Sequence, residues 1–271
     1  MSFDEFERSS YSGIPRFLYE FTLGTTKWRY CNAQVQITHL GAVYQAMPVK
    51  HGEIVMSGDA SADDLTVNIS AKAEVTGLFV ATPPSASLGL VIKTLHRGDT
   101  EAAVIWTGIV KSGKRVSDAE FEFNCNSLMS TLTRNGLRLT WGRGCPHALY
   151  DRGCKVDPAD HGVTAQVLAL TGISVVSAAF ANYADGHFAG GFLSFTGTYG
   201  TIERRAIERH VGNTLTLLGP SDGITTGAWV TAYPGCDRVT ATCLNKFNNL
   251  SNYGGFPHLP NKSPFDGDPV F

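Results

Sequence analysis

The chain has 271 residues, of which 43% are hydrophobic and only 17% are charged, a composition that supplies a buried core and excludes intrinsic disorder. Its formal net charge of −2 provides no general attraction to nucleic acids or anionic membranes, so we expect no sequence-specific nucleic acid binding. The longest apolar stretch, 167–181, is too short and too interrupted to span a bilayer, and the acidic first residues do not resemble a signal peptide. We therefore expect a soluble protein made in a reducing cytoplasm, without a membrane span.

The first 140 residues predict β-strands. Apolar residues alternate with polar ones from Val67 to Val75, and a continuous apolar run over 102–110 is typical of a strand covered on both faces. Cys31 and Cys125 both fall on the apolar faces of predicted strands. A free cysteine in such a place behaves as a small hydrophobic residue, so we expect both to be inert buried thiols.

A second β-rich block follows between residues 163 and 230. Its short strands are separated by turn residues, which indicates a small barrel or sandwich. The predicted strands cover 163–177, 190–195, 214–218 and 228–233. A short, charged stretch, 201–210, is the one helical candidate inside this block.

These patterns predict a mainly β protein in three segments. A β-rich domain covers 1–140, and a second small β barrel or sandwich domain covers 141–235. The C-terminal segment 236–271 contains a short helix and then a tail rich in Gly, Pro and Asn, for which we expect an irregular structure.

The four remaining cysteines form two pairs. Eight residues separate Cys145 from Cys154, six separate Cys236 from Cys243, and 81 lie between the pairs. In a reducing compartment, paired cysteines indicate metal binding or catalysis rather than structural disulfides. Apolar residues at i, i+3, i+7 and i+11 over 236–247 predict a helix with both thiols of the second pair on one face.

Four thiolates from two pairs suit a tetrahedral zinc ion or an iron–sulfur cluster. The spacings match neither a zinc ribbon nor a ferredoxin, and two unrelated buried pairs or conditional disulfides remain alternatives. His147 and His258 are candidate replacement ligands, against the alternative of ordinary polar contacts. Gly144 and Gly235, each directly before a cysteine, would let the backbone approach a bulky ligand. The common hydrolase and phosphate-loop motifs are absent, although a Cys–His hydrolase stays open because its residues meet only in the fold.

The cysteine pairs lie in two longer motifs. Residues 235–257 have the pattern G-C, six residues, C, then K-F-x-N-x-x-N, an aromatic residue and G-G-F-P, and residues 144–150 read G-C-P-H-x-L-Y. These segments resemble a family of tail-tip (hub) iron–sulfur proteins of phages and gene transfer agents, which includes the tail-tip protein L of phage lambda. The resemblance is strong over 141–262 and only architectural before that.

The resemblance implies a structural role in a virion and no enzymatic activity. Proteins of this family form a ring at the distal tip of a non-contractile tail, where the ring connects the distal tail protein and the tape measure protein to the central receptor-binding hub. Residues 1–140 would be the hub domain that reduces the symmetry of the tail tube to three-fold, which implies a homotrimer. The virion would be assembled in the host cytoplasm.

The resemblance also assigns ligands. Carried over position by position, Cys145, Cys154, Cys236 and Cys243 would hold a structural [4Fe–4S] cluster that closes the second domain, with zinc as the alternative metal. The lambda relative has far fewer residues between its pairs, so the block at 163–230 leaves the domain boundaries open. Two other functions also stay open: a tail-associated Cys–His peptidase or cell-wall hydrolase, and a zinc-stabilised binding module.

Overall fold

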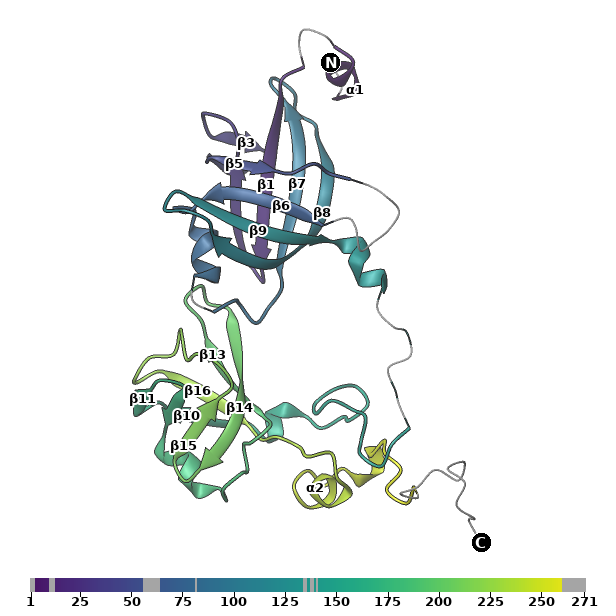
Figure 1. Ribbon diagram of the computed structural model, residues 1–271, viewed down its shortest axis with the longest axis vertical. Coiled ribbons are helices and arrows are strands. Elements are labelled where there is room, and N and C mark those ends of the chain that lie inside the picture. Colours follow the sequence, from purple (N-terminus) through teal and green to yellow (C-terminus); the bar gives the residue numbers. More distant parts are fainter. Residues whose placement is uncertain are drawn as a thin grey trace. The chain divides into compact units, whose positions relative to one another are not determined.

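The computed structural model describes residues 3–9, 13–55, 64–80, 82–133, 136, 139 and 141–259. The chain is mainly β, as predicted, and its contacts divide it into two compact units (Figure 1). The first unit comprises residues 1–134 and 198–203, and the second comprises 135–197 and 204–271. The predicted division into the segments 1–140, 141–235 and 236–271 stays a prediction.

The first unit contains a nine-stranded sheet in the order β3-β4-β2-β1-β7-β8-β9-β6-β5. Its strands are β1 (Pro15–Leu23), β2 (Thr26–Cys31), β3 (Ile37–His39), β4 (Ala42–Ala46), β5 (Val49–His51), β6 (Leu65–Ser70), β7 (Leu88–His96), β8 (Ala102–Arg115) and β9 (Glu120–Ser127). Its helical elements are α1 (Phe3–Glu7) and the 3₁₀ turns η1 (Glu74–Phe79) and η2 (Leu128–Thr133). The sheet curls, so that β6 and β9 cross the face of β1 and β7 in Figure 1.

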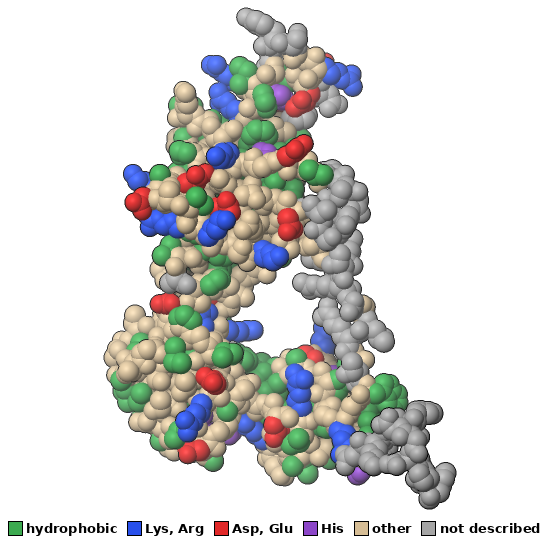
Figure 2. Space-filling view, in the orientation of Figure 1, with side chains coloured by type: hydrophobic (Ala, Val, Ile, Leu, Met, Phe, Trp, Pro, Cys, Tyr) green, Lys and Arg blue, Asp and Glu red, His purple; other side chains and the backbone are tan. Residues whose placement is uncertain are grey.

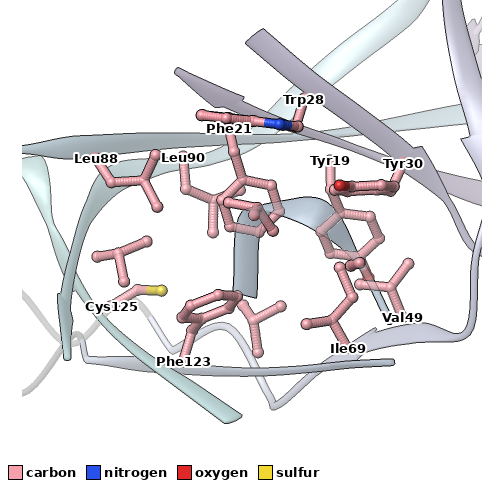
Figure 3. Packing of buried hydrophobic residues seen from close by; sticks show 14 of the residues in the cluster. Tyr19, Phe21, Trp28, Tyr30, Val49, Ile69, Leu88, Leu90, Phe123 and Cys125 are labelled. Atoms are coloured by element: carbon pink, nitrogen blue, oxygen red, sulfur yellow. The ribbon is translucent and has the colours of Figure 1, made fainter. Parts of the chain in front are cut away.

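The curl encloses a core of aromatic and aliphatic side chains. Phe21 and Phe123 come from different parts of the sheet, yet their ring centroids lie 5.6 Å apart. Figure 3 shows the sulfur of Cys125 directed into this cluster, beside Phe123. Cys31 and Cys125 are both fully buried, as the alternation of their strands predicts, and burial raises the pKa of the Cys125 thiol to about 12.

The second unit is built on a seven-stranded sheet in the order β10-β16-β13-β14-β15-β12-β11. The strands are β10 (Val163–Gln166), β11 (Ala169–Thr171), β12 (Ser174–Val176), β13 (Phe192–Thr196), β14 (Ile202–Val211), β15 (Thr214–Leu217) and β16 (Trp229–Tyr233). The other elements are α2 (Thr240–Asn245) and the 3₁₀ turns η3 (Pro158–Asp160), η4 (Ala178–Asn182) and η5 (Leu250–Asn252). The predicted strand 163–177 is three short strands, and the other predicted strands form close to their expected positions.

The prediction of a helix over 201–210 was wrong, because this stretch forms β14. Charged side chains hide its strand character, and a bulge between Ile207 and Arg209 interrupts the alternation of period two. Ile207 and His210 are buried in the unit, and β14 pairs with β15 as antiparallel strands. Tertiary pairing therefore decides the conformation here over local sequence preference.

None of the helices among the described residues is long and apolar enough to cross a membrane. On the face drawn in Figure 2, basic and acidic side chains of the described residues are interspersed.

Candidate metal centre formed by four cysteines

The four paired cysteines line one cavity of about 150 Å³ in the second unit. His147 lines the same cavity. All four cysteines are free thiols, Cys243 is buried and the other three are partly exposed. Burial raises the pKa of Cys236 and of Cys243, and the neighbouring cysteines raise both further because like charges repel. The structure thus brings together the residues that the motif assigned as ligands.

Strand pairing explains why segments separated by 81 residues meet. The first cysteine pair is followed by β10, and the second pair is preceded by β16. These strands are antiparallel neighbours in the register Val163↔Ala232. The beginning of β10 therefore lies beside the end of β16, and the two cysteine-bearing segments leave the sheet from the same end.

Asp151 organises the loop between Cys145 and Cys154. Its carboxylate accepts hydrogen bonds from the backbone N–H groups of Ala148, Gly153 and Cys154, at 3.0, 2.8 and 2.6 Å. Burial raises the pKa of Asp151, but these N–H groups outweigh burial and hold the pKa below its usual range. A charged carboxylate thus fixes the backbone that carries Cys154.

The predicted helix over 236–247 is shorter than expected, because α2 contains only six residues and begins after Cys236. Arg238 has φ = +66°, which a continuous helix does not allow. The Asp237 carboxylate accepts hydrogen bonds from the Val239 N–H and the Thr242 hydroxyl. These contacts turn the chain into the helix at this point, so Cys236 reaches the cavity from a bend and Cys243 from α2.

Strained backbone is concentrated around the cysteines. Five non-glycine residues of the described chain have φ in the left-handed region, and Leu40 in a hairpin turn is one of them. Of the other four, Arg238 lines the cavity, and Tyr150, Lys155 and Asn248 are each next in sequence to a residue that lines it. Each such residue costs on the order of 1–3 kcal/mol and persists only where the surroundings impose it, which is typical of functional sites.

Backbone N–H groups are directed at two of the sulfurs. The Arg238 N–H donates to the Cys236 sulfur at 3.4 Å, and the Gly254 N–H donates to the Cys145 sulfur at 3.5 Å. Hydrogen bonds of this kind stabilise thiolate ligands and tune metal–sulfur centres.

His147 is held between two glycines. A methyl group on Gly153 would overlap Nδ1 of its imidazole, and a methyl group on Gly254 would overlap Nε2. Of the two histidine candidates, His147 therefore lies at the cavity in a fixed position, whereas His258 is exposed and does not line it.

The two glycines that precede cysteines differ in how closely the protein packs against them. A methyl group on Gly235 would collide with the backbone of Ala189 and Gly190, so this glycine permits a close crossing of two chain segments. At Gly144 a methyl group would make only ordinary contacts, with Arg238. The expectation that these glycines make room for a ligand stays a prediction.

The G-G-F-P segment docks on the residues before Cys145. The Phe256 N–H donates to the Gly142 carbonyl at 2.8 Å, and the Phe256 ring stacks on Trp141 with centroids 4.4 Å apart. The Tyr253 hydroxyl donates to the carbonyls of Arg143 and Arg238. The motif includes Tyr253 and Phe256 but gives them no role, and no pattern in the sequence points to Trp141. Pro260 and the rest of the predicted tail lie outside the described residues.

Lys246 of the motif attaches the segment after α2 to the rest of the unit. Its ammonium group donates to the backbone carbonyls of His187 and Gly235 and lies 5.5 Å from the centre of the Phe247 ring. Burial lowers the pKa of Lys246. The lysine therefore serves as a structural cation rather than as part of the cavity.

The donor set fits a metal group that binds thiolates. Among the described side chains, no three of His, Cys, Asp or Glu converge closely enough to chelate a single ion in this conformation. The four cysteines instead surround the cavity. Its volume exceeds the roughly 10–15 Å³ that admits one water-sized sphere.

Comparison with known proteins identifies the family. Residues 17–157, just over half of the chain, match the family described as baseplate hub protein, N-terminal attachment domain. The chain belongs to this family. It is therefore a structural component of a phage or phage-like tail and not an enzyme, so the peptidase and cell-wall hydrolase alternative falls away. Residues 186–263, which include the second cysteine pair, match a family described as phage conserved hypothetical protein BR0599.

Two further comparisons find chains similar to this one. A protein of Xylella fastidiosa (strain 9a5c), described as uncharacterized, is 26% identical over 185 residues, which make up 63% of this chain and 38% of that protein. The match thus spans well under half of that relative. A chain from the virion of a native gene transfer agent particle has the same fold, with a TM-score of 0.82, 19% identity, and coverage of 99% of this chain and 96% of that one.

Proposed function

We propose that this baseplate hub protein forms a homotrimeric ring at the distal tip of a non-contractile tail, where it connects the distal tail protein and the tape measure protein to the central receptor-binding hub. Its second unit would carry a structural [4Fe–4S] cluster on Cys145, Cys154, Cys236 and Cys243. The family match and the fold shared with a gene transfer agent virion chain support the tail-tip role.

The observation that carries the cluster proposal is the convergence of two distant cysteine pairs on one cavity. A single tetrahedral zinc ion, with Zn–S bonds of about 2.3 Å, would draw its four sulfurs to within about 3.8 Å of one another. In a [4Fe–4S] cluster each thiolate binds its own iron, so the sulfurs surround a larger volume. The cavity of about 150 Å³ favours the larger group.

When bound, the cluster would supply four iron–thiolate bonds that tie the 145–154 loop to the segment around α2. The protein prepares this site with the Asp151 loop, the N–H groups directed at sulfur and the left-handed residues. Closing the 81-residue segment between the pairs restricts the unfolded chain, and the loop-entropy relation for a covalent crosslink gives about 4.5 kcal/mol. The group would therefore stabilise a region that has little regular secondary structure.

The direct test is anaerobic purification of the full chain, followed by a visible spectrum and by iron and sulfide assays on the same sample. We expect broad absorbance near ~400 nm from sulfur-to-iron charge transfer and about four irons and four sulfides per chain. Cys236→Ser should lose the iron, and Cys31→Ser, at a buried thiol outside the cavity, should keep it. One zinc per chain, or a metal-free folded protein, would overturn the cluster assignment.

The assembly role has a separate test. Native mass spectrometry of the purified chain should show a trimer, and particles made without this chain should lack the distal tip while retaining tail tubes. If the chain stayed monomeric at all concentrations and also in assembled tips, this would contradict the proposed homotrimeric ring. Normal tips in its absence would contradict the connecting role.

A further inference from the structure

Asn249 of the K-F-x-N-x-x-N motif contacts both cysteine pairs from a buried position. Only 9% of the residue is exposed, and it lines the cavity. Its side-chain amide donates to the Cys154 carbonyl and lies 3.8 Å from the Cys154 sulfur. Its backbone N–H donates to the Cys243 carbonyl at 3.0 Å, and the Cys243 thiol donates to its carbonyl at 3.3 Å.

Asn252, the second asparagine of the motif, determines which way this amide faces. The Asn252 side-chain N–H donates to Asn249 Oδ1 at 2.6 Å. Because the oxygen of the Asn249 amide is the acceptor of this hydrogen bond, its Nδ2 group is the end turned towards Cys154. The two asparagines together present a donor, not an acceptor, to the sulfur.

Three of the four sulfurs thus have a nitrogen donor directed at them. The donors to Cys236 and Cys145 are the backbone N–H groups of Arg238 and Gly254, which no substitution short of proline removes. The donor to Cys154 is the Asn249 side chain. This hydrogen bond can therefore be removed by changing a few side-chain atoms.

We propose that Asn249 is the positioning residue of the metal centre, which holds Cys154 in place and donates a hydrogen bond to its thiolate, and that Asn252 orients it. This inference rests on the proposed function, because it assumes a metal group on the four cysteines. Groups that orient metal ligands affect metal affinity strongly. An N–H directed at a ligand sulfur also offsets negative charge, which favours the reduced state of an iron–sulfur cluster and raises its reduction potential.

The test compares Asn249→Asp, which keeps the shape and loses the donor, with Asn245→Asp, the same change at an exposed position on α2. Each variant is purified anaerobically as the full chain. The readouts are the rate of iron release to a chelator and the midpoint potential of the protein that keeps its cluster. We expect Asn249→Asp to release iron about 10–100-fold faster and to show a lower potential, with Asn245→Asp like the wild type. Unchanged release and potential in Asn249→Asp would overturn the proposal.

Asn252→Ala provides a second variant in case Asn249→Asp does not fold. This substitution removes the partner that orients the Asn249 amide and places no charge near the sulfurs. We therefore expect faster iron release and a lower midpoint potential, with both effects smaller than in Asn249→Asp. If iron release accelerates in a variant while its midpoint potential stays at the wild-type value, Asn249 has a purely structural role, and the proposed hydrogen bond to the Cys154 thiolate is overturned. Wild-type protein without metal would overturn the proposed function itself, whereas metal-loaded wild type with unaffected variants would overturn only this inference.

Discussion

The curled sheet of the first unit and the cysteine-bearing segments of the second use the same residue type in different ways. In the sheet, Cys125 packs in a strand among aromatic side chains, with its sulfur in an apolar core. Around the cavity, the cysteines sit on bends and a six-residue helix, and hydrogen bonds from N–H groups reach their sulfurs. Stability comes from apolar burial in one region, and in the other from polar contacts to the backbone, which the proposed metal group would complete.

The largest expected effect is a loss of stability of the first unit when a side chain is removed from the core of its sheet. Phe123 is fully buried and contacts Phe21, Phe79 and Phe121. We expect Phe123→Ala to lower the free energy of unfolding of the first unit by about 3–5 kcal/mol and to leave the iron content of the protein unchanged. Denaturant unfolding combined with hydrogen exchange would measure this, with Val104→Ala at an exposed position as the control. A loss of iron in Phe123→Ala would contradict the view that the core of the first sheet and the cysteine cavity are stabilised separately.

A single type of substitution, made in each region, sharpens the comparison. Cys125→Ser places a hydroxyl in an apolar core and should cost about 1–3 kcal/mol without a change in iron content. Cys243→Ser should abolish cluster binding and increase hydrogen exchange over 141–162 and 234–259, while exchange in β1, β7 and β9 stays as in the wild type. Equal iron in the two variants would be incompatible with this difference between core and ligand cysteines.

Gly254→Ala probes how tightly the cavity wall is packed. The added methyl group would overlap the His147 imidazole, and such overpacking typically costs about 1–3 kcal/mol. We expect a less stable second unit and weaker iron retention. Gly142→Ala is the matched control, because a methyl group there meets no atom within 4 Å. If both variants retained iron equally well, the position of His147 would not matter for the centre.

The smallest expected effect is a pH dependence confined to the second unit. Burial, together with the positive charge of the nearby Lys246, lowers the pKa of His187 to about 4. The unfolded chain, with an ordinary histidine pKa of about 6.5, binds more protons between these values, so the stability contribution of neutral His187 is lost as the pH falls from about 6.5 to about 4. The side chain is only half-buried, which keeps the effect small.

The measurement is the pH dependence of hydrogen exchange in the wild type and in His187→Phe, which keeps a ring for the contacts with Tyr183 and Phe188. The variant should lose part of the destabilisation seen in the wild type between pH 6.5 and pH 4. Identical pH profiles in the two proteins would rule out His187 as the titrating group.

Local patterning in the sequence was enough to predict most of the β-structure. Alternation of period two placed Cys31 and Cys125 in the core, and turn residues separated the strands of the second unit close to where they lie. The motifs also named the four cysteines that meet at one cavity. The alternation and the turns depend on neighbours in the sequence, so the sequence alone contains them, whereas the set of four cysteines rested on the resemblance of the two motifs.

Only the tertiary structure decided the rest, because the deciding interactions join residues far apart in the chain. Pairing of β10 with β16 brings the cysteine pairs together. Pairing with β15 makes the charged stretch 201–210, predicted as a helix, into the strand β14. The positive φ of Arg238 delays the start of the predicted helix, so that α2 begins only at Thr240. The direction of the Asn249 amide depends on Asn252 and on Cys154, which lies 95 residues away. Non-local hydrogen bonds leave no periodic signal in a sequence, and they are what shape this centre.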